Sequence, residues 1–155
     1  MENEKDILII MADDDHDDIM LTQKALQKSG LLNPLVAVND GEELLDYLLH
    51  RGKYTDTKKY PLPGIILLDL NMPKKDGRET LQEIKSHAEL KSIPVVIFTT
   101  SKAEEDIYKS YELGVNSFVT KPVKFEELVK VIASLGGYWF KIVQLPANKR
   151  SPINN

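Results

Sequence analysis

The chain has 155 residues, the usual size of one domain, and 42% of them are hydrophobic, which is enough for a sizeable core. Its formal net charge is −4, and because neutralising phosphates requires a basic surface, we expect no nucleic-acid partner. It has no cysteine, no signal-peptide core in its charged start MENEKD, and no apolar run near the roughly 20 residues of a membrane span, so we expect a cytoplasmic protein with no membrane partner.

The first half of the chain predicts two strands and two helices. The apolar run at 6–11 (DILIIM) is followed by a helix over 18–29, which Ser29-Gly30 ends, and by a short strand over 35–38. Asp40 then begins a helix whose leucines recur at i, i+1, i+4 and i+5. Residues 50–63 are polar and carry two prolines, so we interpret them as a surface loop.

The second half continues the alternation of strands and helices. A run of β-branched and other apolar residues at 64–68 (GIILL) predicts a strand buried on both faces. A helix is expected over 78–89, a strand over 93–98, a helix from 102 to about 113, a short strand over 116–119 and an amphipathic helix over 126–135. Ser101 and Glu104 have the spacing of a capping box for the fourth helix. Five β-α units predict an α/β fold with a doubly wound, five-stranded parallel sheet and helices on both faces.

Polar residues follow four of the predicted strands. Asp13 and Asp14 follow the first, Asp69 the third, Thr99 the fourth and Lys121 the fifth. In a parallel sheet these ends share one edge, where open α/β sheets bind ligands. Three carboxylates in one place require a cation, and oxygen ligands without His or Cys favour Mg²⁺. Asp69 is then a candidate nucleophile towards phosphorus, Lys121 and the cation neutralise charge, and the Thr99 hydroxyl donates to a phosphoryl oxygen.

Each of these signals also has a simpler explanation. Asp is common at the start of a helix that follows a strand, so Asp69 alone resembles a helix cap. We assign Asp15, Asp17 and Asp18 to the simpler role of complementing the dipole of the first helix. The combination of four strand ends is much more specific than any one of them.

The combination resembles the receiver domain of two-component response regulators over about residues 5–135. The residues that carry the resemblance are Asp13-Asp14, DLNMPKKDG at 69–77, Thr99 and Lys121-Pro122. It implies a flavodoxin-like sheet of order 2-1-3-4-5, a receiver domain over 1–136 and a C-terminal extension over 137–155 without an output domain. It also implies a signalling protein rather than an enzyme, with slow self-dephosphorylation.

The resemblance assigns roles in phosphoryl transfer to several residues. Asp69 is the phosphoacceptor for a partner histidine kinase. Asp13, Asp14 and Asp69 bind Mg²⁺, with the backbone carbonyl of Asn71 as a further ligand. Lys121 contacts the phosphoryl group.

Further roles concern the response to phosphorylation. Thr99 is the switch hydroxyl, and Phe118 is the switch aromatic residue where a tyrosine is common. The Lys121–Pro122 peptide bond is expected to be cis. The readout face is then the fourth helix, the fifth strand and the fifth helix.

The loop at 50–63 and the apolar stretch YWFKIVQLP at 138–146 resemble the stand-alone regulators paired with bacterial and cyanobacterial phytochrome kinases. This implies a bacteriophytochrome-type kinase as partner. Two interpretations of the stretch remain open: Trp139, Phe140, Ile142 and Val143 add to the core, or they form a surface for self-association or kinase docking. A homodimer is expected through the readout face or this extension.

Three other functions are weighed against the receiver. An aspartate-dependent phosphohydrolase would need a second acid two residues after its nucleophile, but Asn71 stands there and cannot transfer a proton. A flavin- or nucleotide-binding module would need a phosphate-binding loop after the first strand, where this chain has ADDDHDD. A role as a phosphorelay intermediate stays open.

Overall fold

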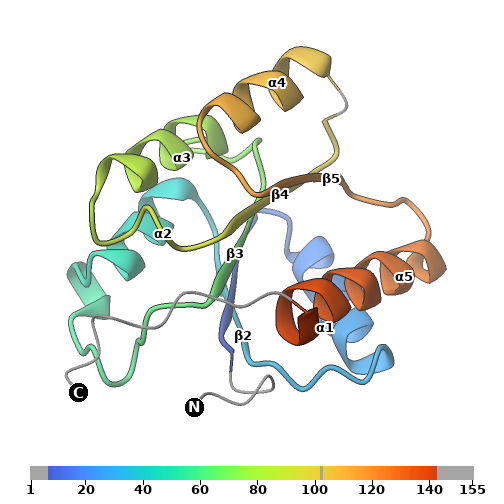
Figure 1. The fold of residues 1–155 in the computed structure, drawn as a ribbon. Helices are drawn as coiled ribbons and strands as arrows, with labels where there is room; N and C mark the ends of the chain where they lie inside the picture. Colours follow the sequence, from blue (N-terminus) through green and yellow to red (C-terminus); the bar gives the residue numbers. More distant parts are fainter. Residues whose placement is uncertain (1–6, 102, 143–155) are drawn as a thin grey trace.

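The computed structural model describes residues 7–101 and 103–142. It contains one parallel sheet of five strands in the order β2-β1-β3-β4-β5, as predicted (Figure 1). The strands are β1 (Ile9–Ala12), β2 (Leu35–Val38), β3 (Ile65–Leu68), β4 (Val95–Thr99) and β5 (Ser117–Thr120). The helices are α1 (His16–Lys28), α2 (Gly41–Leu48), α3 (Gly77–Ser86), α4 (Glu104–Glu112) and α5 (Phe125–Gly136), with a 3₁₀ turn η2 (Gly52–Tyr54) and a π-helical turn η3 (Gly137–Ile142).

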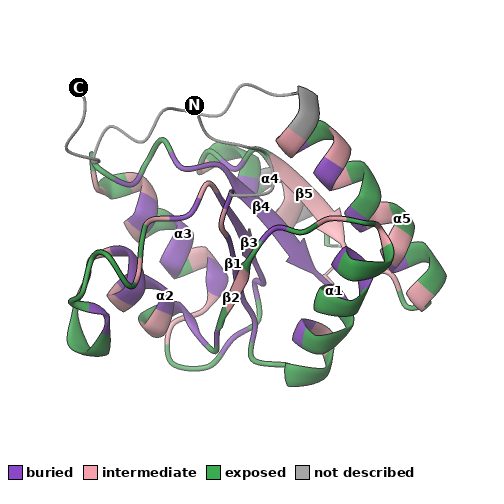
Figure 2. Ribbon diagram, turned by 90° about the horizontal axis from the view of Figure 1, so that it is seen from below, coloured by how far each residue is buried: buried purple, intermediate pink, exposed green. Residues whose placement is uncertain are grey.

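The helices form a layer on each face of the sheet. Helices α1 and α5 cover one face, and α2, α3 and α4 cover the other (Figure 1). Successive side chains of a strand point to opposite faces, so each central strand supplies both layers. In β3, for example, Ile66 and Leu68 join the core under α2 and α3, while Ile65 and Leu67 join the core under α1 and α5. The three central strands are buried throughout, which explains their unbroken apolar sequences (Figure 2).

Aspartates begin three of the helices. Asp15 accepts hydrogen bonds from the backbone N–H groups of Asp17 and Asp18, so α1 begins at His16, two residues earlier than predicted. Asp40 caps α2 through the N–H of Glu43. At α3, Asp76 forms a reciprocal capping box with the glutamate three residues later.

The predicted capping box at α4 is wrong. Ala103 is the N-cap residue, and it makes no side-chain capping bond within the described part of the chain. The Ser101 hydroxyl instead donates to Oδ2 of Asp106 at 2.8 Å, and Arg78 of α3 donates to both oxygens of the same carboxylate at 3.0 and 2.8 Å. The Ser101 hydroxyl thus donates to the carboxylate that Arg78 also binds, and its oxygen accepts from the N–H of Ala103 at 3.4 Å.

The loop over 50–63 is tied to α2 and is only partly a surface loop. The Tyr54 ring is buried between Tyr47 and Tyr60, with ring centroids 5.0 and 4.9 Å away. Its hydroxyl donates to Oε2 of Glu43 at 2.5 Å, and Oε1 of the same glutamate accepts from the backbone N–H of Asn39 at 2.8 Å. The loop therefore shares a hydrogen-bonded carboxylate with the segment that leads from β2 into α2.

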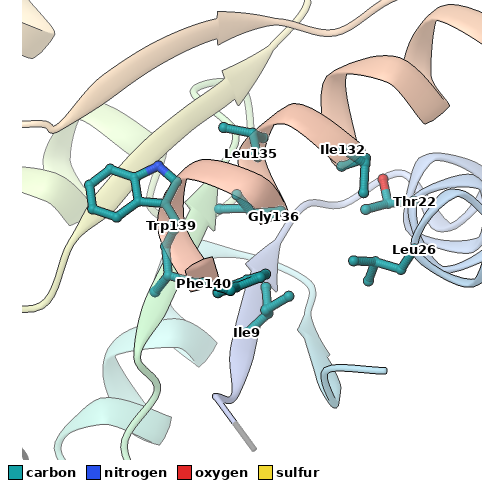
Figure 3. Close-up of a pocket in the computed structure, with 10 residues that line it drawn as sticks. Ile9, Thr22, Leu26, Ile132, Leu135, Gly136, Trp139 and Phe140 are labelled. Atoms are coloured by element: carbon teal, nitrogen blue, oxygen red, sulfur yellow. The ribbon is translucent and has the colours of Figure 1, made fainter. Parts of the chain in front are cut away.

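After α5 the backbone continues directly into η3. Trp139 is 5% exposed and belongs to the core between the sheet and helices α1 and α5. Phe140 packs against the same core, and both rings border a small apolar cavity of about 20 Å³ that also contacts Ile9, Leu26 and Ile132 (Figure 3). For Trp139 and Phe140 the structure thus confirms the prediction of extra core.

The side chain of Ile142 and the whole of Val143 lie outside the described residues. Within the described ranges, no helix is both long enough and apolar enough to cross a membrane.

Candidate functional site

Two acidic residues meet where β1 and β3 end. Ala12 and Leu68 are partners in the parallel register, so the residues that follow them, Asp13 and Asp69, lie side by side. The N–H of Asp69 donates to the carbonyl of Ala12 at 3.0 Å, and the N–H of Asp13 donates to the carbonyl of Val38 at 3.0 Å. Both side chains are buried, since Asp13 is 0% and Asp69 7% exposed. The sheet itself therefore fixes the two carboxylates in the interior.

Asp14 extends this pair to the surface. It is exposed, and one carboxylate oxygen from each of Asp13, Asp14 and Asp69 can be chosen so that all three lie within 4.8 Å of one another. Buried carboxylates without a countercharge are costly, and an all-oxygen group of this size suits a hard divalent cation. Asn71 is exposed directly beside them, and its N–H donates to Oδ1 of Asp69 at 3.4 Å. The three carboxylates predicted as metal ligands are thus brought together.

Lys121 provides the countercharge of the site. Its ammonium donates to Oδ2 of Asp13 at 2.5 Å, to Oδ2 of Asp18 at 2.8 Å and to Oδ2 of Asp69 at 3.4 Å. The lysine side chain is 7% exposed. Its backbone N–H donates to the carbonyl of Thr99 at 2.7 Å, so the ends of β4 and β5 are joined next to the ammonium.

Burial and ion pairing act in opposite directions on these groups. Burial raises the pKa of Asp13 from 3.8 to about 6, although hydrogen bonding to Lys121 acts against the rise. Burial also lowers the pKa of Lys121, but its hydrogen bonds to Asp13 and Asp18 outweigh this and hold the pKa above its ordinary value. The lysine thus stays charged at neutral pH, while part of the burial cost of Asp13 remains uncompensated.

Asp18 belongs to the site, contrary to the simpler role assigned from the sequence. It lies in the first turn of α1 and is partly exposed, and its carboxylate reaches Lys121 across the site. A helical signal could have indicated this, because Asp18 precedes the buried Thr22 by four positions and therefore lies on the inward face of α1. Asp17 lies in the first turn of α1 as predicted, whereas Asp15 is the N-cap residue.

The start of α1 is also connected to the loop after β2. The Nε2 atom of His16 lies 3.0 Å from Oδ1 of Asn39, whose backbone N–H is held by Glu43. The start of the helix that follows Asp13 and Asp14 is therefore hydrogen-bonded, through Asn39, to Glu43 of α2.

The predicted switch residues lie on the next two strands. Thr99 is fully buried at the end of β4, and its hydroxyl oxygen accepts from the N–H of Ser101 at 3.4 Å. Phe118 of β5 is half-buried against the core on the α2–α4 face, and its N–H donates to the hydroxyl of Tyr111 in α4 at 3.2 Å. Phe118 thus connects β5 to α4, which is the element expected to respond.

The predicted cis Lys121–Pro122 bond is wrong for this structure, in which every peptide bond of the described residues is trans. Trans is the intrinsically preferred isomer of an X–Pro bond by about 0.5–1 kcal/mol. Here the backbone bond to Thr99 and the three carboxylates around the ammonium already hold Lys121 in place with the trans isomer.

Comparison with known proteins agrees with this fold. The model of the response regulator receiver domain family matches residues 9–133. Response regulator Rcp1 of Synechocystis sp. is 41% identical over 140 residues, which cover 90% of this chain and 93% of Rcp1.

Two solved structures are similar over nearly their whole length. The phosphorylated cyanobacterial phytochrome response regulator RcpA has a TM-score of 0.85 and 42% identity, covering 92% of this chain and 99% of RcpA. The Mn²⁺-bound form of Rcp1 has a TM-score of 0.82 and 41% identity, covering 91% of this chain and 99% of Rcp1. These matches confirm the predicted fold and the resemblance to phytochrome-associated regulators. The chain belongs to the response regulator receiver domain family, whose members are signalling proteins.

Proposed function

We propose that this protein is a single-domain response regulator that accepts a phosphoryl group on Asp69. The observation that carries the proposal is the position of Asp69: it ends a central strand, is almost buried, and lies 3.4 Å from the ammonium of Lys121 and within the acidic group that suits a cation. A buried carboxylate between an ammonium and a site for a cation is suited to attack a phosphoryl donor, because both charges stabilise the transferring group.

The transfer uses few groups. A carboxylate oxygen of Asp69 forms a bond to phosphorus while the bond between phosphorus and an imidazole nitrogen of the kinase histidine breaks. The imidazole leaves with the electron pair and takes up a proton from water. Lys121 then pairs with an oxygen of the transferred group, exchanging one of its carboxylate partners for a more highly charged one.

The residues present fit a divalent cation, which we propose to be Mg²⁺. Asp13, Asp14 and Asp69 would hold it, with the backbone carbonyl of Asn71 as a further ligand. When bound, the cation neutralises negative charge on the phosphoryl oxygens. The Mn²⁺-bound structure of Rcp1 supports a divalent ion in a similar chain.

We propose that the response travels from Thr99 to α4, β5 and α5. Phosphorylation adds about −1.5 to −2 charges next to Thr99. The Thr99 hydroxyl exchanges its weak contact with Ser101 for the phosphoryl group, and the segment that follows β4 moves with it. The Phe118 ring then changes its packing. It can act only through van der Waals contacts because it has no hydroxyl to donate, and its backbone N–H is bonded to the Tyr111 hydroxyl of α4.

The partner is a histidine kinase, and we propose a phytochrome-type kinase because RcpA is described as a phytochrome response regulator. We further propose a homodimer through the α4-β5-α5 face or the C-terminal extension. The receiver domain is proposed to end at Gly136. Trp139 and Phe140 belong to the extension, and they stabilise the domain by packing on its core.

The test is intact-mass spectrometry after incubation with acetyl phosphate, with and without Mg²⁺, on the wild type and on Asp69→Asn. A phosphoryl adduct that requires Mg²⁺ and is absent from the variant is expected. Following the adduct over time measures the slow self-dephosphorylation. If the wild type gains no adduct, or if Asp69→Asn gains the same one, phosphoacceptance by Asp69 is refuted.

A phosphohydrolase on the same nucleophile is disfavoured. Asn71 is exposed beside Asp69 where a second acid would be needed, and its amide cannot transfer a proton.

A further inference from the structure

Lys121 is held by one carboxylate that does not belong to the metal-binding group. Asp13 and Asp69 come from the ends of β1 and β3, whereas Asp18 comes from α1 and reaches the same ammonium at 2.8 Å. We infer that Asp18 is a positioning residue that keeps the Lys121 ammonium at the site, but to one side, when a divalent cation binds Asp13, Asp14 and Asp69. This inference rests on the proposed function.

The argument begins with competition for Asp13. Its Oδ1 atom accepts from the N–H of Asp15 at 2.9 Å, and its Oδ2 atom accepts from Lys121. Both oxygens of this fully buried carboxylate are therefore engaged. A cation that binds Asp13 must share an oxygen with one of these donors, and the mobile donor of the two is the lysine side chain.

Repulsion adds to this competition. An ammonium that loses part of its bond to Asp13 lies next to a divalent cation of the same sign, in a site with little access to water. Asp18 offers the ammonium a partner outside the metal-binding group, so the lysine can turn towards α1 without losing its countercharge. Lys121 then stays within reach of a phosphoryl group on Asp69.

Asp18 is itself well fixed. Its N–H donates to the capping carboxylate of Asp15 at 3.3 Å, and its carbonyl accepts from the Thr22 hydroxyl at 2.8 Å. The carboxylate thus projects from an ordered first turn, which is a suitable support for a positioning contact. Neither of these backbone bonds depends on the charge of the Asp18 side chain.

The experiment measures Mn²⁺ affinity of the full chain by the electron paramagnetic resonance signal of free Mn²⁺. Asp18→Asn is expected to weaken binding about tenfold, or about 1.4 kcal/mol, because the ammonium must then remain against Asp13 and Asp69. Asp17→Asn is the matched control: it removes the same charge from the same helical turn, and Asp17 is exposed and forms no ion pair within the described residues. We expect less than about a twofold change for it, because an exposed charge is screened.

The same substitution in a chain without the Lys121 ammonium distinguishes a positioning role of Asp18 from a general effect of its negative charge on cation binding. In Lys121→Met, Asp18 has no ammonium to hold, so Asp18→Asn is expected to change Mn²⁺ affinity by no more than the Asp17 control does. Asp18→Glu, which keeps the charge, is expected to restore most of the wild-type affinity. Thermal unfolding of each variant confirms that the measured chains are folded.

Equal effects of Asp18→Asn and Asp17→Asn would overturn the inference, and so would a tenfold effect that persists without Lys121. These results leave the proposed function intact, because the wild type still binds Mn²⁺ and still accepts the phosphoryl group. A wild-type chain that binds no Mn²⁺ would refute the metal site, and the inference with it.

Discussion

Replacing Lys121 by methionine tests whether the ammonium compensates the buried carboxylates. Methionine keeps most of the volume of the side chain and removes its charge. At an effective dielectric near 20, unit charges at the observed 2.5, 2.8 and 3.4 Å attract by about 5 to 7 kcal/mol per pair. Most of this is offset by the cost of removing the ions from water, and the net cost of breaking such a pair is about 3–5 kcal/mol.

We expect the variant to lose about 3 kcal/mol at pH 7 without divalent cations, the lower end of that range. The loss is limited because Asp13, with its pKa already raised by burial, can take up a proton. A carboxyl with a raised pKa in the folded state binds its proton more tightly there than in the unfolded chain, so the variant regains stability as the pH falls through that pKa. Saturating Mg²⁺ is expected to restore most of the lost free energy of unfolding at pH 7, since the cation replaces the missing positive charge.

The assay is urea unfolding in EDTA and in MgCl₂, followed by the fluorescence of Trp139, the one tryptophan of the chain. Lys130→Met is the control, because that side chain is 75% exposed and pairs only weakly with Glu127. Our reasoning is refuted if Lys121→Met is as stable as the wild type in EDTA, or if its loss of stability is the same with and without Mg²⁺.

Three further predictions concern stability around the site. Asp106→Asn is expected to cost about 1–2 kcal/mol at pH 7, because it breaks the bidentate bond from Arg78. The bond from Arg78 lowers the pKa of Asp106 below 3.8, so the difference from the wild type is present above that pH and disappears as the pH falls through the lowered pKa. Gly77→Ala is expected to cost about 1–3 kcal/mol and to slow phosphorylation, because a Cβ atom there would lie 2.2 Å from the carbonyl oxygen of Asp69. Trp139→Ala is expected to cost about 3–5 kcal/mol, since it empties a filled site in the core. Urea unfolding at several pH values measures the three losses of stability, and the intact-mass assay over time measures the phosphorylation rate of Gly77→Ala.

Each has a control of its own. The difference between Asp106→Asn and the wild type should shrink as the pH falls below 3.8 if the charge is responsible, and a difference that does not change with pH contradicts the assignment. Gly137→Ala provides a glycine with open space around its Cβ position, so its stability should stay near that of the wild type. Trp139→Phe keeps an aromatic ring and is expected to cost much less than the alanine variant; equal costs would mean that ring packing contributes little.

The strands and the meeting of polar residues at their ends could be predicted from the sequence because both depend on local pattern. Unbroken apolar runs such as 64–68 are the direct result of burial on both faces, and the residue after each run is at the sheet edge. Once the strands were parallel, Asp13, Asp69 and Lys121 had to meet at the same edge. The receiver family was predicted from this combination and confirmed by the family match.

What could not be predicted depends on side chains that meet across elements. The partner of Ser101 is set by Asp106 and by Arg78 on a different helix, so the local capping signal was misleading. The spacing from Thr22 indicates that Asp18 lies on the inward face of α1, but its bond to Lys121 joins two elements that are far apart in the sequence. The buried position of Tyr54 in a polar loop likewise results from two tyrosines outside the 3₁₀ turn.

The tie between Tyr54 and Glu43 makes the loop over 50–63 a poor unit for exchange between related proteins. A transplanted loop without the tyrosine would leave one oxygen of Glu43 without its donor, while the other still holds Asn39 next to His16. The loop, the first turn of α2 and the start of α1 would then have to be moved as one block. The loop that leads into β3 and Asp69 is thus also bonded, through Glu43 and Asn39, to the helix that follows Asp13 and Asp14.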